Sequence, residues 1–167
     1  MQDDNPYRAP DAVVADVAVA GELPLASLGE RFLGALVDTV LLLALVLPIM
    51  FMGGYFQAAM TGQAPGIGTQ LFYTLLAFGL FCVVQGYPLA QTGQTWGKKV
   101  MKTRIVDLDG AKPSLATLLG KRYLPVQLVG AVPFIGNLLV LVDVLLIFRS
   151  DRRCGHDLVA GTRVVKS

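Results

Sequence analysis

Residues 31–52, RFLGALVDTVLLLALVLPIMFM, decide how this chain folds. Apart from Arg31 at the start and Asp38 seven residues later, the stretch carries no charge. As a helix, the run from residue 32 to 52 would be about 31 Å long, enough to cross the hydrocarbon core of a bilayer. A helix that is apolar on every side does not lie on the surface of a soluble domain. The stretch therefore predicts a transmembrane helix that contains a costly carboxyl group.

A second uncharged stretch, TQLFYTLLAFGLFCVVQGYPLA, covers residues 69–90 and predicts a second transmembrane helix. The composition agrees, because only 16% of the residues are charged and 54% are hydrophobic, whereas soluble domains carry about 25% charged residues. With 167 residues the chain has the length of one domain. We therefore expect an all-α integral membrane protein.

The third apolar region, residues 123–148, is too long for one straight span, at about 39 Å of helix. Turn-forming residues interrupt it: Gly130, Pro133, Gly136 and Asn137. Pro113 and Ser114 resemble a helix start upstream of it. The pattern predicts a broken helical hairpin with helices over 114–132 and 136–149.

The distribution of basic residues predicts the orientation in the membrane. The loop over 53–68 has no Lys or Arg, whereas residues 91–122 contain seven and the tail after residue 148 contains five. Basic loops stay in the cytoplasm, and a hairpin keeps both basic segments there. We therefore expect a multi-pass protein of a bacterial inner (cytoplasmic) membrane with cytoplasmic N- and C-termini.

The acidic N-terminal segment, residues 1–25, lacks the basic start and apolar core of a signal peptide. We expect it to be a disordered tail. Residues 26–167 then form a single transmembrane domain, with a basic cytoplasmic loop over 91–113 and a basic tail over 150–167.

Two ten-residue segments of the chain are similar to each other. GKKVMKTRIV (97–106) and HDLVAGTRVV (156–165) align without gaps and share four residues, which are one Val, one Thr, one Arg and the final Val. Both end in β-branched residues, which favour strands. The hypothesis is that they pair into a small cytoplasmic β element.

Ionisable residues inside membrane spans usually face the interior of the helix bundle, pair with other polar groups there, and mark the pathways of ions or substrates. Arg31 and Asp38 share a helix face with Gly34 and Ala35, but lie about 10.5 Å apart along the axis, so we expect each to reach a third group. In the hairpin arrangement, Asp143 lies at the same depth as Asp38. The two carboxylates could share a proton or a cation, or lock the packing through Arg31, Arg122 or backbone groups.

The C-terminal HD pair, His156 and Asp157, has no nucleophile in a strained turn beside it. We expect Asp157 to organise basic residues of a cytoplasmic basic face, which comprises Lys98, Lys99, Arg122, Arg152 and Arg153. No nucleophile–base set and no cluster with zinc-ligand spacing is visible, so we expect neither an enzyme, a metal site nor a cofactor. A single Trp and no long basic–aromatic run argue against nucleic-acid binding.

Taken together, three motifs resemble the RDD family of membrane proteins, named for one arginine and two aspartates. They are RFLGALVD with Arg31 and Asp38, GQTWGKKVMKTRIVDLDG over 93–110, and the ending HDLVAGTRVV. The second family aspartate matches Asp157 in the ending motif best, and Asp143 is a second candidate that the sequence leaves open. The resemblance implies a small polytopic membrane protein for which transport is often proposed.

Two functional hypotheses follow. In the first, the protein transports a small ion or solute through its buried Arg and Asp groups. In the alternative, it is a non-catalytic interaction or assembly subunit whose basic face binds a partner protein or anionic lipid. Because one small bundle offers little room for a path, we expect contact with membrane lipids and either a homo-oligomer or a partner membrane protein.

Overall fold

The structure is a computed structural model that describes residues 23–62, 65–132 and 135–167. The first half of the chain forms α1 (Leu28–Met52), α2 (Tyr55–Met60), α3 (Ile67–Thr92), α4 (Trp96–Val100) and β1 (Thr103–Asp107). The second half forms the π-helix η1 (Thr117–Tyr123), α5 (Leu124–Gly130), α6 (Ile135–Leu145), the 3₁₀-helix η2 (Leu146–Phe148), α7 (Gly155–Ala160) and β2 (Thr162–Lys166).

Both predicted transmembrane helices are present and are slightly longer than expected. A capping box starts α1, in which Ser27 and Glu30 satisfy each other's backbone N–H groups. Only 6% of the most apolar window of α1 and of α3 is buried. A core helix of a soluble protein would be mostly buried, so these apolar surfaces fit contact with lipid. The chain is a mostly helical membrane protein with two candidate membrane-spanning helices.

The broken apolar region folds back on itself, with α5 packed against α6. Ser114 accepts from Thr117 N at the predicted start of this hairpin. The helix predicted over 114–132 is not uniform, because η1 is a π-helix that gives way to α5. Leu124 N donates to Leu119 O, five residues back, and Pro125 follows directly without an N–H to donate. Residues 133–134, where the predicted break lies, are outside the described residues.

The two similar segments pair, as the sequence hypothesis expected. β1 and β2 form an antiparallel two-stranded ribbon in which Ile105 lies opposite Val164. These are equivalent positions of the two segments, so a local two-fold axis passes between them. Both side chains are buried in the core with Ala26, Leu89 and Leu118. The ribbon is therefore held against the helices by its apolar face.

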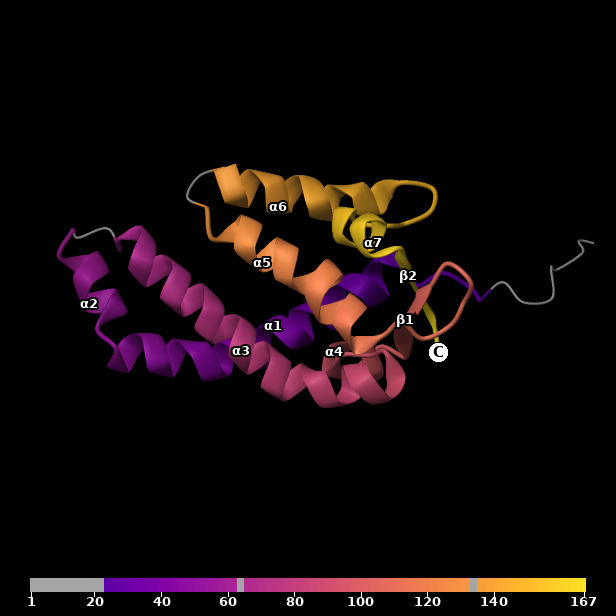
Figure 1. The fold of residues 1–167 in the computed structure, drawn as a ribbon, viewed down its shortest axis with the longest axis horizontal. Coiled ribbons are helices and arrows are strands. Elements are labelled where there is room, and N and C mark those ends of the chain that lie inside the picture. Colours follow the sequence, from indigo (N-terminus) through magenta and orange to yellow (C-terminus); the bar gives the residue numbers. More distant parts are fainter. Residues whose placement is uncertain (1–22, 63–64, 133–134) are drawn as a thin grey trace, which may run out of the picture.

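The whole fold repeats one order of elements. In each half a pair of antiparallel helices is followed by a short helix and a strand, and α4 and α7 are the equivalent short helices. The residue directly before the strand has a positive φ in both halves, +51° at Lys102 and +64° at Gly161. Figure 1 shows α4, α7 and both strands at one end of the long helices, and α2 at the other. The hydrogen-bond and ion-pair networks described below lie at the strand end.

Three short helices and the start of the ordered chain differ from the sequence expectation. α2, α4 and α7 are five or six residues long, too short for periodicity to reveal. Residues 1–22 of the predicted N-terminal tail lie outside the described residues, but its last part is not a disordered tail. Leu25 bridges Val165, and Lys166 N donates to Pro24 O at 2.9 Å. Backbone pairing with the edge of β2 therefore orders this segment.

Candidate functional site

A buried charge triad centres on Asp157 in α7. Its Oδ2 lies 2.5 Å from Nη2 of Arg31 at the start of α1, and its Oδ1 pairs with Nη1 of Arg122 in η1. Asp157 is 0% exposed, Arg122 2% and Arg31 9%. Burial by itself would raise the pKa of Asp157, but the guanidiniums of Arg122 and Arg31 outweigh it and hold the pKa well below its ordinary value. Asp157 is therefore a permanently charged anchor.

The triad also ties several segments together. Arg31 donates to the carbonyl of Arg152, and Arg122 donates to Thr162 Oγ1 at 2.6 Å. Cys154 N donates to Asp157 Oδ2 at 3.1 Å. Two helices, the turn before α7 and the first residue of β2 therefore meet at one carboxylate. This arrangement fixes the fold, because a buried charge that loses its partner is costly.

Asp38 lies in a second network with a different character. Its Oδ1 accepts from Gln85 Nε2 at 2.8 Å and from Gly97 N at 2.7 Å, and its Oδ2 accepts from Thr95 Oγ1 at 2.5 Å. Gln85 in turn accepts from Trp96 N at 2.9 Å. As expected, Asp38 contacts other segments rather than Arg31, and it attaches α1 to α3 and to the start of α4.

The donors to Asp38 are all uncharged. Within the part of the chain that the structure describes, no Lys, Arg or His lies within ion-pair distance of its carboxyl group. Gln85 is 2% and Thr95 1% exposed, so these partners are themselves withdrawn from solvent. The backbone approaches closely here, because a Cβ on Gly97 would overlap the carbonyl oxygen of Gly34. Gly34 and Gly97 therefore allow α4 to reach the carboxyl group of Asp38.

Asp143 in α6 caps the next short helix in a comparable way. Its Oδ1 accepts from His156 N at 2.5 Å, and its Oδ2 lies 2.6 Å from His156 Nδ1. His156 and Gly97 are equivalent positions of the two repeated segments, so each half of the fold uses a helix-borne aspartate to cap its short helix. Asp38 and Asp143 share no hydrogen-bond partner among the described residues, which argues against a shared proton or cation.

His156 sits between two carboxylates. Its Nε2 is 4.0 Å from Asp157 Oδ2, so its close partner is Asp143 rather than its neighbour in sequence. Burial lowers the pKa of His156, against the opposing effect of its hydrogen bond to the carboxylate of Asp143. The imidazole is therefore neutral near pH 7 and lies between the carboxyl groups of Asp143 and Asp157.

One group of side chains has metal-ligand chemistry: ligand atoms of Cys154, His156 and Asp157 lie within 4.8 Å of one another. The group does not fit a cation, because Asp157 already binds two guanidiniums. Burial also raises the pKa of the Cys154 thiol to about 11, despite the nearby Arg31, so the thiolate that a metal requires is disfavoured.

Of the five residues predicted to form a cytoplasmic basic face, four are at least partly exposed and one, Arg122, is buried. Lys98, Lys99 and Arg153 are half-buried and Arg152 is exposed. The first two belong to α4 and the other two to the turn before α7, and Figure 1 shows both short helices at the strand end of the fold. Arg122 does not belong to this face, since it is buried in the triad with Asp157. A guanidinium that finds a buried carboxylate is withdrawn from solvent.

Sequence reasoning missed Gln85, Thr95 and Gly97 as partners of Asp38. Gln85 is the one strongly polar side chain in the interior of an otherwise apolar span, which is a usable signal. Thr95 and Gly97 belong to the GQTWGKK motif, where Thr95 caps α4 and accepts from Lys98 N. The motif therefore forms the start of α4, where Thr95 and the backbone of Gly97 donate to the carboxylate of Asp38.

Comparison with known proteins agrees with these features. The family model described as RDD family matches residues 25–161, which include Asp38 and Asp157. Over 104 residues the chain is 32% identical to the Uncharacterized protein YckC of Bacillus subtilis (strain 168). This similarity covers 62% of the chain and 64% of the length of YckC. No solved structure matches the chain.

Proposed function

The chain belongs to the RDD family, and on that premise we propose that it transports a small ion, with Asp38 as the group that binds and releases a proton. The observation that carries this proposal is the contrast between the carboxylates of Asp157 and Asp38. Asp157 is fixed by two arginines, whereas Asp38 has only uncharged donors among the described residues.

Protonation of Asp38 would change the direction of one hydrogen bond as well as the charge. A carboxylate accepts from all three of its donors, but a protonated carboxyl group must use one oxygen to donate. Thr95 can accept instead, because a hydroxyl group works in both directions, whereas Gly97 N and Gln85 Nε2 only donate. A proton on Asp38 therefore leaves the three contacts in place but removes the negative charge that strengthens them, which weakens the attachment of α4 to α1. Because α4 is followed by β1, a shift of α4 would also move the β1–β2 ribbon.

We place the protein in a bacterial inner membrane with the strand end in the cytoplasm, since that end carries the basic residues. α1 and α3 cross the bilayer, and the α5–α6 hairpin enters and returns on the same side. A reporter fused to the C-terminus tests this orientation. Activity of a reporter that works only in the cytoplasm supports this orientation. Activity of a reporter that works only in the periplasm would refute a hairpin that returns to the cytoplasmic side.

Ion flux into proteoliposomes under a pH gradient tests the role of Asp38. Asp38→Asn keeps the size of the side chain and removes its proton exchange, so flux should fall to the level of empty liposomes. Asp143→Asn is the matched control, since it alters the equivalent cap in the other half and should retain flux. Both variants are first compared with wild type by thermal unfolding. A well-folded Asp38→Asn variant with wild-type flux would overturn the proposal.

A second candidate is an assembly subunit in contact with a partner membrane protein or a second copy. η1 and α5 have seven residues each, about 21 Å of helix, which is shorter than α1 and α3 by several turns. The far halves of α1 and α3 are therefore not covered by this hairpin. Purification in mild detergent should then yield a stoichiometric complex or oligomer. A monomer that catalyses ion flux by itself argues against this candidate.

A further inference from the structure

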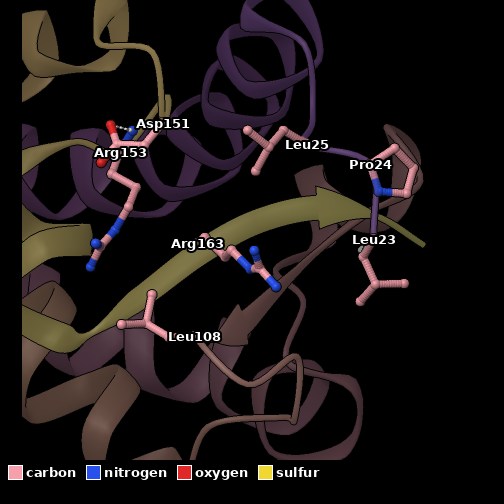
Figure 2. A pocket seen from close by; sticks show the side chains of 7 residues that line it. All are labelled: Leu23, Pro24, Leu25, Leu108, Asp151, Arg153 and Arg163. Carbon is pink, nitrogen blue, oxygen red and sulfur yellow. Dashed lines mark hydrogen bonds between the residues drawn. The ribbon is translucent and has the colours of Figure 1, made fainter. Parts of the chain in front are cut away.

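A cavity of about 360 Å³ lies at the strand end of the fold, and neither Asp38, Asp143 nor Asp157 lines it. One wall is the segment Leu23–Leu25, which runs beside β2, and another is Leu108 in the turn after β1. Figure 2 shows Arg163 on β2 between Leu25 and Leu108. The volume lies within the range of about 300–1,000 Å³ that is usual for small-molecule sites.

Arg163, which lines this cavity, has an unsatisfied hydrogen-bond donor. Its Nε is buried and has no hydrogen-bond partner, although buried polar groups are nearly always satisfied. Among the described residues, Arg163 forms no ion pair. A guanidinium presents several donors in one plane, which match a carboxylate or a phosphate. Its surroundings therefore favour an anionic ligand.

A second arginine adds a fixed positive charge to the same cavity. Arg153 lines it and is held in place by donating from Nε to Thr162 O at 3.0 Å and from Nη2 to Asp157 O at 3.1 Å. Asp151 also lines the cavity, but its carboxylate pairs with Arg149 at 3.2 Å. The net charge at the cavity is therefore positive, and Leu23, Leu25 and Leu108 provide an apolar side.

The duplication of the fold supplies an internal comparison. Arg104 on β1 is the equivalent of Arg163, lies on the same face of the ribbon, and also has a buried Nε without a partner. It does not line the cavity, because the Leu23–Leu25 segment runs along β2 and not along β1. Because the Leu23–Leu25 segment lies beside only one of the two strands, only one of the two equivalent arginines lines a pocket.

We propose that this cavity binds a small amphiphilic anion, with its carboxylate or phosphate group on Arg163 and its short apolar part against the three leucines. Such a group can come from a soluble metabolite or from the headgroup of an anionic lipid. The proposal is independent of proton exchange at Asp38, because it involves other residues and needs no transport.

Calorimetric titration of the purified protein in a neutral detergent tests the site, with hexanoate and hexyl phosphate as probes and hexylamine as the cationic control. Both anions should bind and hexylamine should not. Arg163→Gln should weaken binding roughly tenfold or more, the usual effect of losing a charged hydrogen-bond donor. Leu108→Glu should also weaken it, because it adds a negative charge at a residue that is 54% exposed and tolerant of change. Arg104→Gln is the matched control and should bind like wild type.

Nanodiscs distinguish the two sources of the anion. A weaker apparent affinity for hexyl phosphate in phosphatidylglycerol discs than in phosphatidylcholine discs identifies a lipid headgroup at Arg163, and equal affinities identify a soluble ligand. Binding that is unchanged in both Arg163→Gln and Leu108→Glu would overturn the proposal. An equal loss in Arg104→Gln would do so too, since it would indicate unspecific attraction to the basic end of the fold.

Discussion

Replacing Asp157 by Asn should destabilise the folded protein more than any other neutralisation of a single carboxylate. Asn has nearly the same volume but keeps only one acceptor oxygen, and its amide group would face a guanidinium donor. Arg31 and Arg122, at 9% and 2% exposure, would then share one neutral partner in a buried site. Removing one member of a buried ion pair costs about 3–5 kcal/mol. For a chain of this size that corresponds to a decrease of about 6–20 °C in the unfolding temperature.

The measurement is thermal unfolding in dodecyl maltoside, followed by circular dichroism and by size-exclusion chromatography after heating. Asp151→Asn is the matched control, because it breaks a pair between side chains that are 36% and 51% exposed, and solvent screens such pairs. The control should unfold like wild type. If Asp157→Asn unfolds within 2 °C of wild type, or if both variants lose the same stability, the triad does not anchor the fold.

The pH dependence adds a second readout to this prediction. The pKa of Asp157 in the folded protein lies below its ordinary value of 3.8, so the unfolded state takes up its proton first as the pH falls. The stabilisation is therefore complete above about pH 4 and is lost as the pH falls further toward the folded pKa. The difference between wild type and Asp157→Asn should be constant from pH 7 to pH 5 and shrink below pH 4.

Three further predictions concern neighbouring features. Gly97→Ala should lower the unfolding temperature because its Cβ would overlap the Gly34 carbonyl oxygen, whereas Gly34→Ala should be tolerated because its nearest contact is 3.4 Å; equal effects would contradict this close approach. In a Cys82→Ser background, Cys154 should resist maleimide at pH 8 until the protein is unfolded in dodecyl sulfate, since burial raises its pKa to about 11; rapid labelling of folded protein would refute this. Because the pKa of folded His156 lies below its ordinary value of 6.5, wild type should lose stability as the pH falls below about 6.5, and His156→Gln should reduce that loss; an unchanged profile would show that His156 does not titrate on unfolding.

The two candidate membrane-spanning helices could be predicted because their signal is local. Lipid allows only long apolar segments with internal hydrogen bonds, so residues 31–52 and 69–90 could be identified without any tertiary information. The pairing of β1 with β2 could be proposed from the similarity of 97–106 and 156–165, since repeated segments in a symmetric fold meet at equivalent positions. The boundary of the N-terminal tail could not, because Leu25 is ordered only by the edge of a strand more than 130 residues away.

The partners of the charged side chains depend on the tertiary structure for the same reason. Sequence spacing showed that Arg31 and Asp38 are too far apart on one helix to satisfy each other fully, but not that Arg31 would reach Asp157 and Asp38 would reach Gly97. Hydrogen bonds and ion pairs act over about 3 Å, so their partners are set by how the halves pack, not by distance along the chain.

The sequence by itself determined that this chain enters a membrane, where its long apolar helices lie, and that its charges are few and expensive. Apolar transfer is additive along the chain, so composition and order are enough to settle it. Only the tertiary structure decided that Arg122 leaves the basic face for the triad, that Asp38 and Asp143 cap equivalent short helices, and that one of two equivalent arginines lines a cavity. Those outcomes require segments from both halves to meet, and pairwise contacts of that kind have no local signature.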